Sequence, residues 1–146
     1  MTVIAWDGKT LAADKRMTAG WVTSPIVKKI RRSNGELIAA TGNASIAVQL
    51  FDWHSKGCDP DTWPECNKDP AKDSITHLIV INEKTGIRKY ESSGYAVHIE
   101  NKFMAWGGGH EAAMAVLHLG FDAKKAVEVT SEIIQGVGNG VDTLEF

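Results

Sequence analysis

Thr2 carries two groups that can act together as a catalyst. Removal of Met1 would make Thr2 the N-terminal residue, with a hydroxyl nucleophile and an α-amine base on the same residue. Threonine is small enough for the usual trimming of an initiator methionine. The reference pKa of an α-amine is about 7.7 to 8.0, which is close to working pH and suits a proton acceptor. The sequence therefore predicts that the mature chain begins at Thr2 and that its Oγ attacks a carbonyl carbon.

A hairpin at the start of the chain brings a carboxylate to Thr2. Two short apolar, β-compatible segments flank Asp7-Gly8, a dipeptide favoured in two-residue hairpin turns. With these two residues as the turn, Thr2 pairs with Ala13. Asp14 then lies level with the residue before Thr2, so the register alone predicts a carboxylate at the chain terminus.

A second hairpin is predicted to bring a lysine and a glycine to the same place. The segments 26–32 and 36–41 flank an Asn34-Gly35 turn. In that register Lys29 and the Gly42-Asn43 turn share the open end of the hairpin. If the two hairpins lie side by side, the candidate residues of both converge.

Only one of two consecutive lysines can take part. Successive side chains of a strand point to opposite faces, so Lys28 and Lys29 cannot both face Thr2. The register favours Lys29.

Several segments, in their order and spacing from the N-terminus, are similar to the proteasome β-subunit family, and in particular to the bacterial HslV-type peptidases. The resemblance covers most of the chain outside residues 56–73. It is carried by Thr2, by D-G-x-x-x-A-A-D-x-R at 7–16, by V-K-K-I at 27–30, by the glycine turn before a helix, by A-W-G-G-G at 105–109 and by D-T-L-E-F at 142–146.

The resemblance implies a fold, an activity and a role for each candidate residue. The fold is α+β, the four-layer αββα sandwich of N-terminal nucleophile hydrolases, formed by one domain over residues 1–146 with a shortened helical layer. The activity is that of a threonine peptidase. Lys29 favours loss of the hydroxyl proton of Thr2, Asp14 holds Lys29, and the amides of Gly42 and Asn43 form the oxyanion site.

Two departures from the family keep other functions open. The family has Gly-Gly at the oxyanion turn, where this chain has Gly42-Asn43, and it has a serine where this chain has Gly107. An inactive ring-forming or interaction protein is the main alternative, and an N-terminal nucleophile amidase acting on a small amide is a lesser one. Phosphate binding by the glycine run at 107–109 is a weaker reading.

The composition excludes some classes of partner. A net charge of −2 argues against nucleic acid, and no stretch is long enough to span a bilayer. We expect a cytoplasmic protein in which Cys58 and Cys66 are free thiols. Their spacing does not fit a zinc knuckle or ribbon, so they are not expected to bind zinc. No metal or cofactor is expected. The chain has no phosphate-binding G-x-x-x-x-G-K-[ST] motif, so an ATP-dependent unfoldase, which the resemblance implies, would be a separate protein acting on unfolded polypeptides.

The remaining pattern predicts the order four strands, one helix, four strands, two helices, one strand. Expected elements include a helix at 44–54, a loop at 58–73, strands at 75–81 and 87–91, a strand pair at 95–99 and 102–106, a helix at 111–119 and a helix capped by Asp122. Phe51 and Trp53 suggest more apolar surface on the first helix than one small domain can cover. We therefore expect a closed homo-oligomeric ring.

Overall fold

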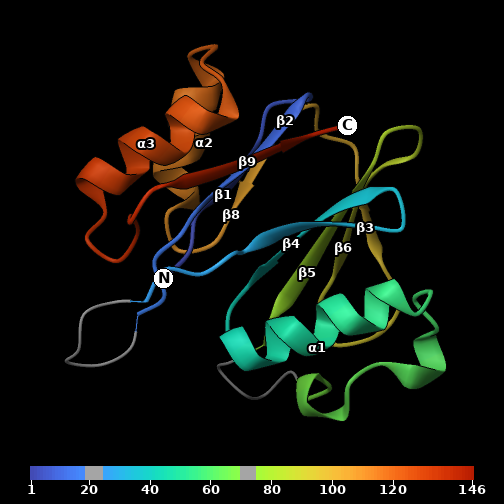
Figure 1. Ribbon diagram of the computed structural model, residues 1–146. Coiled ribbons are helices and arrows are strands. Elements are labelled where there is room, and N and C mark those ends of the chain that lie inside the picture. Colours follow the sequence, from blue (N-terminus) through green and yellow to red (C-terminus); the bar gives the residue numbers. More distant parts are fainter. Residues whose placement is uncertain (19–24, 70–74) are drawn as a thin grey trace. The chain divides into compact units, whose positions relative to one another are not determined.

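The predicted order of elements is present in the computed structural model, which describes residues 1–18, 25–69 and 75–146 (Figure 1). These residues form β1 (Ile4–Trp6), β2 (Thr10–Asp14), β3 (Ile30–Ser33), β4 (Glu36–Thr41), α1 (Ala44–Ser55), β5 (His77–Asn82), β6 (Gly86–Tyr90), β7 (Val97–Ile99), β8 (Met104–Trp106), α2 (His110–His118), α3 (Ala123–Ile133) and β9 (Val141–Glu145). They divide into two compact units, one of Met1–Ile30 with Asn101–Phe146 and one of Arg31–Glu100.

The first unit is an antiparallel sheet with two helices packed on it. The strands lie in the order β8-β1-β2-β9, and α2 and α3 lie side by side against them (Figure 1). Small side chains fill much of the space between sheet and helices, including Ala5, Ala12, Ala113 and Ala126, all fully buried. Because alanine adds little bulk, the helix backbones can approach the sheet closely.

The register of the first hairpin differs by two residues from the prediction. Ala13 pairs with Ile4, whereas the sequence predicted Thr2 as its partner. The amide of Asp14 donates to the carbonyl of Val3 at 3.2 Å, so Asp14 lies opposite Val3. The carboxylate still arrives at the start of the chain, because a shift of two residues leaves each side chain on the same face of the sheet.

The local chemistry of the turn explains that shift. Gly8 has φ of 97°, which glycine adopts without strain, and it occupies the first central position of the turn. The carboxylate of Asp7 accepts the amides of Lys9 at 2.9 Å and Thr10 at 2.7 Å. Asp7 therefore stabilises the turn from its first position and is not one of the two central residues.

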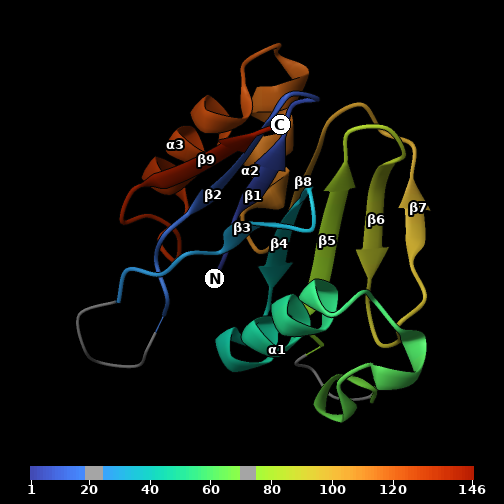
Figure 2. The ribbon, with the colours of Figure 1, turned by 45° about the vertical axis from the view of Figure 1, so that its right-hand side comes forward.

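The second unit is an antiparallel sheet in the order β3-β4-β5-β6-β7, with α1 packed on β4 and β5 (Figure 2). The predicted Asn34-Gly35 turn is confirmed: both residues have positive φ, 51° and 74°, as a type I′ turn requires. Asn43 caps α1, its side chain accepting the amides of Ser45 and Ile46. The predicted helix at 44–54 is therefore confirmed as α1.

Two expectations for this part of the chain are wrong. The segments 95–99 and 102–106 do not pair: β7 pairs with β6, and β8 pairs with β1 in the other sheet. Phe51 and Trp53 are buried, not exposed, and pack against the sheet, so α1 does not present them as apolar surface. On α1 the large apolar residue at the surface is Val48.

The segment expected to be a loop contains two short 3-10 helices, Pro60–Thr62 and Glu65–Asn67, while residues 70–73 of that prediction lie outside the described residues. Trp63 is buried against Trp53, with ring centroids 4.8 Å apart in an edge-to-face arrangement. The buried Asn67 donates its side-chain amide to the carbonyls of Thr76 and Glu91. These contacts anchor the segment to the second unit.

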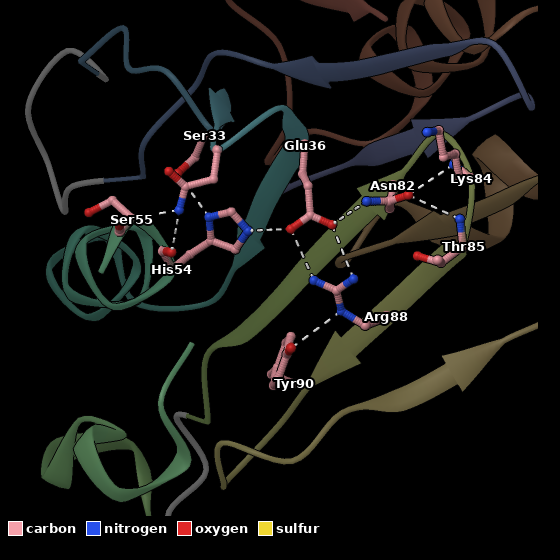
Figure 3. Close-up of polar contacts among 10 residues, drawn as sticks. Ser33, Glu36, His54, Ser55, Asn82, Lys84, Thr85, Arg88 and Tyr90 are labelled. Atoms are coloured by element: carbon pink, nitrogen blue, oxygen red, sulfur yellow. Dashed lines mark hydrogen bonds and ion pairs between the residues drawn. The ribbon is translucent and has the colours of Figure 1, made fainter. Parts of the chain in front are cut away.

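A polar cluster around Glu36 ties together the turns and helix of the second unit (Figure 3). The Glu36 carboxylate accepts two hydrogen bonds from the Arg88 guanidinium, at 3.0 and 3.1 Å, and one from the Asn82 amide at 3.0 Å. The buried His54 ring contacts Glu36 at 2.9 Å and Ser33 at 2.8 Å. Burial alone would raise the pKa of Glu36, but the hydrogen bonds from Arg88, His54 and Asn82 outweigh it and hold that pKa below its ordinary value.

We predict that Glu36→Gln lowers the free energy of unfolding at pH 7 by about 3 kcal/mol, because Arg88 loses its ionised partner at a largely buried position. The pKa of Glu36 is lower in the folded protein than in the unfolded chain, where it is about 4.3, so the ionised carboxylate stabilises the fold at pH values above the unfolded pKa. This stabilisation is lost as the pH falls through the folded pKa. The variant should therefore lose less stability than the wild type between neutral and acid pH. Urea unfolding at both pH values measures this.

The matched control for that experiment is Glu83→Gln, since Glu83 is exposed in the turn between β5 and β6. It should change stability by less than about 0.5 kcal/mol. A Glu36 variant as stable as the control at pH 7 would contradict a stabilising role for the cluster.

Candidate active site

Asp14 and Lys29 form a buried ion pair next to the first residues of the chain. Asp14 is fully buried at the end of β2, and its Oδ1 accepts a hydrogen bond from Lys29 Nζ at 2.8 Å. The same oxygen accepts the Val3 amide at 3.0 Å. Sequence reasoning predicted this pair, and the structure brings the two residues together.

The second oxygen of Asp14 is equally well satisfied. Oδ2 accepts the amide of Arg16 at 3.3 Å and the amide of Gly138 at 3.1 Å. A buried carboxylate is costly unless its lone pairs are used, and here it has four donors. The Gly138 contact joins the loop before β9 to the start of the chain, and the sequence gave no sign of it.

Lys29 lies at the peptide bond between Met1 and Thr2. Its Nζ donates to the carbonyl oxygen of Met1 at 3.1 Å. Lys29 is buried, whereas Lys28 is exposed, so the prediction that only Lys29 faces inward is confirmed. Burial lowers the pKa of Lys29 below its ordinary value, although Asp14 acts in the opposite direction.

The α-amine of the chain lies in the same environment. The Met1 amine donates to Thr18 Oγ1 at 3.2 Å. Burial and the positive charge of Lys29 lower the pKa of this amine, while Asp14 partly offsets them. A lowered amine pKa increases the neutral fraction that can accept a proton at neutral pH.

The glycine run before α2 holds the backbone of Thr2. The Gly109 amide donates to the Thr2 carbonyl at 3.3 Å. Gly107 has φ of 92°, and a Cβ there would come within 2.1 Å of the Thr2 oxygen. Residue 107 must therefore be glycine in this backbone, and a serine side chain of the kind found in the family does not fit.

Gly42 and Asn43 belong to the second unit, and their place in the site stays a prediction. Gly42 has φ of 123°, and a Cβ there would lie 2.8 Å from Thr76 Oγ1. The amide of Asn43 donates to the same hydroxyl at 3.0 Å. Asn43 has an ordinary extended backbone with φ of −75°. Its role in the structure is to cap α1.

The first unit also contains a cavity of about 560 Å³ between α3 and the loop before β9. Arg16, Lys125, Glu128 and Glu132 line it, so its charges are mixed. In the part of the chain that the structure describes, no three His, Cys, Asp or Glu side chains are grouped as metal ligands would be. Within the same residues, no helix is long and apolar enough to cross a membrane.

No protein-family model matches the sequence, and no curated protein is significantly similar to it. Solved structures do share the fold. HslV from Trypanosoma brucei superimposes with a TM-score of 0.66 at 21% identity, over 100% of both chains. Thiobacillus denitrificans BPH superimposes with a TM-score of 0.73 at 19% identity, over 99% of this chain and 96% of that one. The same protein in complex with epoxomicin gives 0.71 at 16% identity, over 99% and 97%.

These likenesses confirm, for the fold, the resemblance inferred from the sequence. The described residues form two antiparallel sheets and three α-helices, and this mixed fold is similar to the folds of HslV and BPH.

Proposed function

We propose that this chain is a proteasome-type threonine peptidase whose nucleophile is Thr2, exposed as the N-terminus by removal of Met1. The observation that carries the proposal is the buried Asp14–Lys29 pair, whose ammonium lies 3.1 Å from the carbonyl oxygen of Met1. A buried cation beside an N-terminal threonine lowers the free energy of the alkoxide. The fold shared with HslV supports the same assignment.

In the proposed reaction, the neutral α-amine of Thr2 takes the proton from Oγ as Oγ bonds to a substrate carbonyl carbon. The carbon–nitrogen bond then breaks, and the amine returns the proton to the leaving nitrogen. Water hydrolyses the resulting ester, with the amine again acting as base. Lys29 stabilises the developing negative charge, and Asp14 positions Lys29 from its four-donor site.

Gly42 and Asn43 are the proposed source of the oxyanion hydrogen bonds. The Asn43 amide would have to exchange its bond with Thr76 for one with the substrate. That requirement, and the glycine in place of serine at 107, favour the alternative of an inactive ring-forming or interaction protein that retains the fold. Activity measurements on the mature chain decide between the two.

The likeness to HslV supports further proposals about organisation. The fold would be the four-layer αββα sandwich of that family, formed by one domain. Copies of the chain would form a ring, and a separate ATP-dependent unfoldase would supply it with unfolded polypeptide. The protein would be cytoplasmic, since Cys58 and Cys66 are both free thiols and the cytoplasm is reducing. A large apolar residue on α1, Val48, and two after α2, Leu119 and Phe121, are more than half exposed and offer surface for subunit contacts.

We predict that Thr2→Ala abolishes cleavage of unfolded casein while leaving the unfolding temperature within a few degrees of the wild type. The substitution removes the nucleophile and little else, and alanine is also small enough for Met1 to be removed. Turnover is followed by release of labelled peptides. Undiminished turnover in the variant would show that the activity belongs to another residue or to a contaminant.

We predict that Lys29→Ala lowers kcat by at least about 100-fold, and that Lys28→Ala changes it less than about twofold. Lys29 is buried on Asp14, whereas Lys28 is exposed, so the second variant is the matched control. Equal losses in the two variants would exclude the proposed electrostatic role. Circular dichroism of both variants separates this role from a loss of fold.

Assembly gives an independent test. We predict that light scattering coupled to size exclusion finds a closed homo-oligomer at micromolar concentration, and that charged substitutions at Val48 and Leu119 dissociate it. Lys124→Glu, a charge change at an exposed position on α3, is the control and should leave the assembly intact. A monodisperse species near 15.9 kDa would refute the ring.

A further inference from the structure

The loop between α3 and β9 is bonded to the end of β2 through one glycine. The Gly138 amide donates to Asp14 Oδ2 at 3.1 Å, and the Gly138 carbonyl accepts the amide of Lys15 at 3.0 Å. Gly138 has φ of 147°, so a side chain there would be strained. The bond to Asp14 therefore depends on the loop staying in place.

Arg16 holds the same loop with its side chain. Its guanidinium donates from Nη1 to the Gln135 carbonyl at 2.7 Å and from Nη2 to Asn139 Oδ1 at 3.3 Å. These two acceptors lie on either side of Gly138 in the sequence. The planar, forked guanidinium bonds both acceptors at once, which the single ammonium of a lysine does not do in the same fixed geometry. Arg16 therefore spans the part of the loop that bonds Asp14.

The backbone of Arg16 also lies on the path to Lys29. Arg16 pairs with Ile26 in an isolated antiparallel bridge, and the Val27 amide donates to the Lys15 carbonyl at 2.9 Å. Two residues after Val27 the chain reaches Lys29. The segment that contains Arg16 thus joins the loop before β9 to the segment that carries Lys29.

The shape of a carboxylate makes the loop important for Lys29. The two oxygens of Asp14 are fixed relative to each other, and Oδ1 bonds Lys29 Nζ at 2.8 Å while Oδ2 bonds the Gly138 amide. A loop that moved away from Oδ2 would let the carboxylate rotate, and Oδ1 would then no longer hold the ammonium in one position. Arg16 also acts by its charge: burial lowers the pKa of Lys29 most, Asp14 opposes this, and Arg16 lowers that pKa further.

We propose that Arg16 is a positioning residue of the candidate active site, which holds the loop at 135–139 so that the Gly138 amide fixes the carboxylate of Asp14 beside Lys29. We call its two bonds to the loop the Arg16 clamp. Arg16 acts through Gly138 and Asp14 and is not itself a catalytic residue. The effect on turnover rests on the proposed peptidase function, whereas the clamp can be measured without any activity.

The first arm of the test measures the clamp by NMR on the purified full chain. In Arg16→Gln the Gly138 amide should exchange with solvent about tenfold faster relative to the amides of β1, because the loop opens more readily without the two guanidinium bonds. The pKa of Lys29, followed at its ε-carbon, should rise, because a repelling charge is lost. The other charged groups beside Lys29, Asp14 and the terminal amine, are unchanged in the variant.

Arg16→Lys separates the charge of Arg16 from its two bonds. It keeps the positive charge, so the pKa of Lys29 should stay closer to its wild-type value than in Arg16→Gln. It does not keep the fork, so the Gly138 amide should still exchange faster than in the wild type.

The second arm measures kcat and KM of the mature chain on labelled, unfolded casein. Arg16→Gln should lower kcat about tenfold, since a small displacement of a catalytic group costs up to about 100-fold in rate, and KM should change less than about twofold. Arg16→Lys should also lower kcat.

Lys15→Gln is the matched control for both arms. It removes the same charge one residue away, and the Lys15 ammonium pairs with Asp142 on β9, at 3.4 Å, instead of bonding the loop. It should leave kcat, the exchange of the Gly138 amide and the pKa of Lys29 close to their wild-type values.

The outcomes separate the clamp from the peptidase. Faster Gly138 exchange and a raised Lys29 pKa in Arg16→Gln, with no turnover even by the wild type, would retain the clamp and reject the peptidase. Turnover that is equal in Arg16→Gln and Lys15→Gln would retain the peptidase and reject Arg16 as a positioning residue.

A fall in kcat of Arg16→Gln with unchanged Gly138 exchange and unchanged Lys29 pKa would also overturn the proposal, since Arg16 would then act only on general stability. If Arg16→Gln fails to fold by circular dichroism, Arg16→Lys decides. Wild-type exchange and wild-type kcat in that variant would contradict the clamp.

Discussion

The buried carboxylate of Asp14 holds together the parts of the first unit that surround the start of the chain. It accepts the amide of Val3 from β1, the amide of Gly138 from the loop before β9, and the ammonium of Lys29. A charge taken out of water is tolerated only when such bonds replace its hydration, so all of them must form together. Removal of the carboxylate would leave the Lys29 ammonium buried without its ionic partner, a change that typically costs about 3 to 5 kcal/mol.

Glycine backbones complete the surroundings of the N-terminus. Gly107 and Gly109 contact the Thr2 carbonyl, and Gly108 and Gly136 contact the Met1 side chain. Because these residues lack side chains, their backbone atoms lie close to the first two residues of the chain. Asp14 ends β2 and Gly107 follows β8, so the carboxylate and the glycine run are both attached to the β8-β1-β2-β9 sheet.

Much of the fold could be predicted from the sequence because its signals are local. The Asn34-Gly35 turn, the helix at 44–54 and the order of strands and helices each follow from a few neighbouring residues. The errors arose where a tertiary interaction decides. The strands β7 and β8 are adjacent in the sequence, yet each pairs with an earlier strand, a choice that local pattern does not encode.

The site shows the same division between local and tertiary information. The predicted register of the second hairpin favoured Lys29 over Lys28, and that of the first hairpin placed Asp14 at the start of the chain, even though the first register was wrong by two residues. The Gly138 amide on Asp14 could not be found, since it joins positions far apart in the chain. Gly107 was noticed only as a missing serine, and its contact with Thr2 required coordinates.

The most direct test of this account is the intact mass of the protein purified from a host that processes initiator methionine normally. The account predicts a mass lower than that of the full sequence by one methionine residue, so that Thr2 is N-terminal and its amine is free. A mass that retains Met1 would contradict it, because the amine would then be part of a peptide bond and could not act as the base.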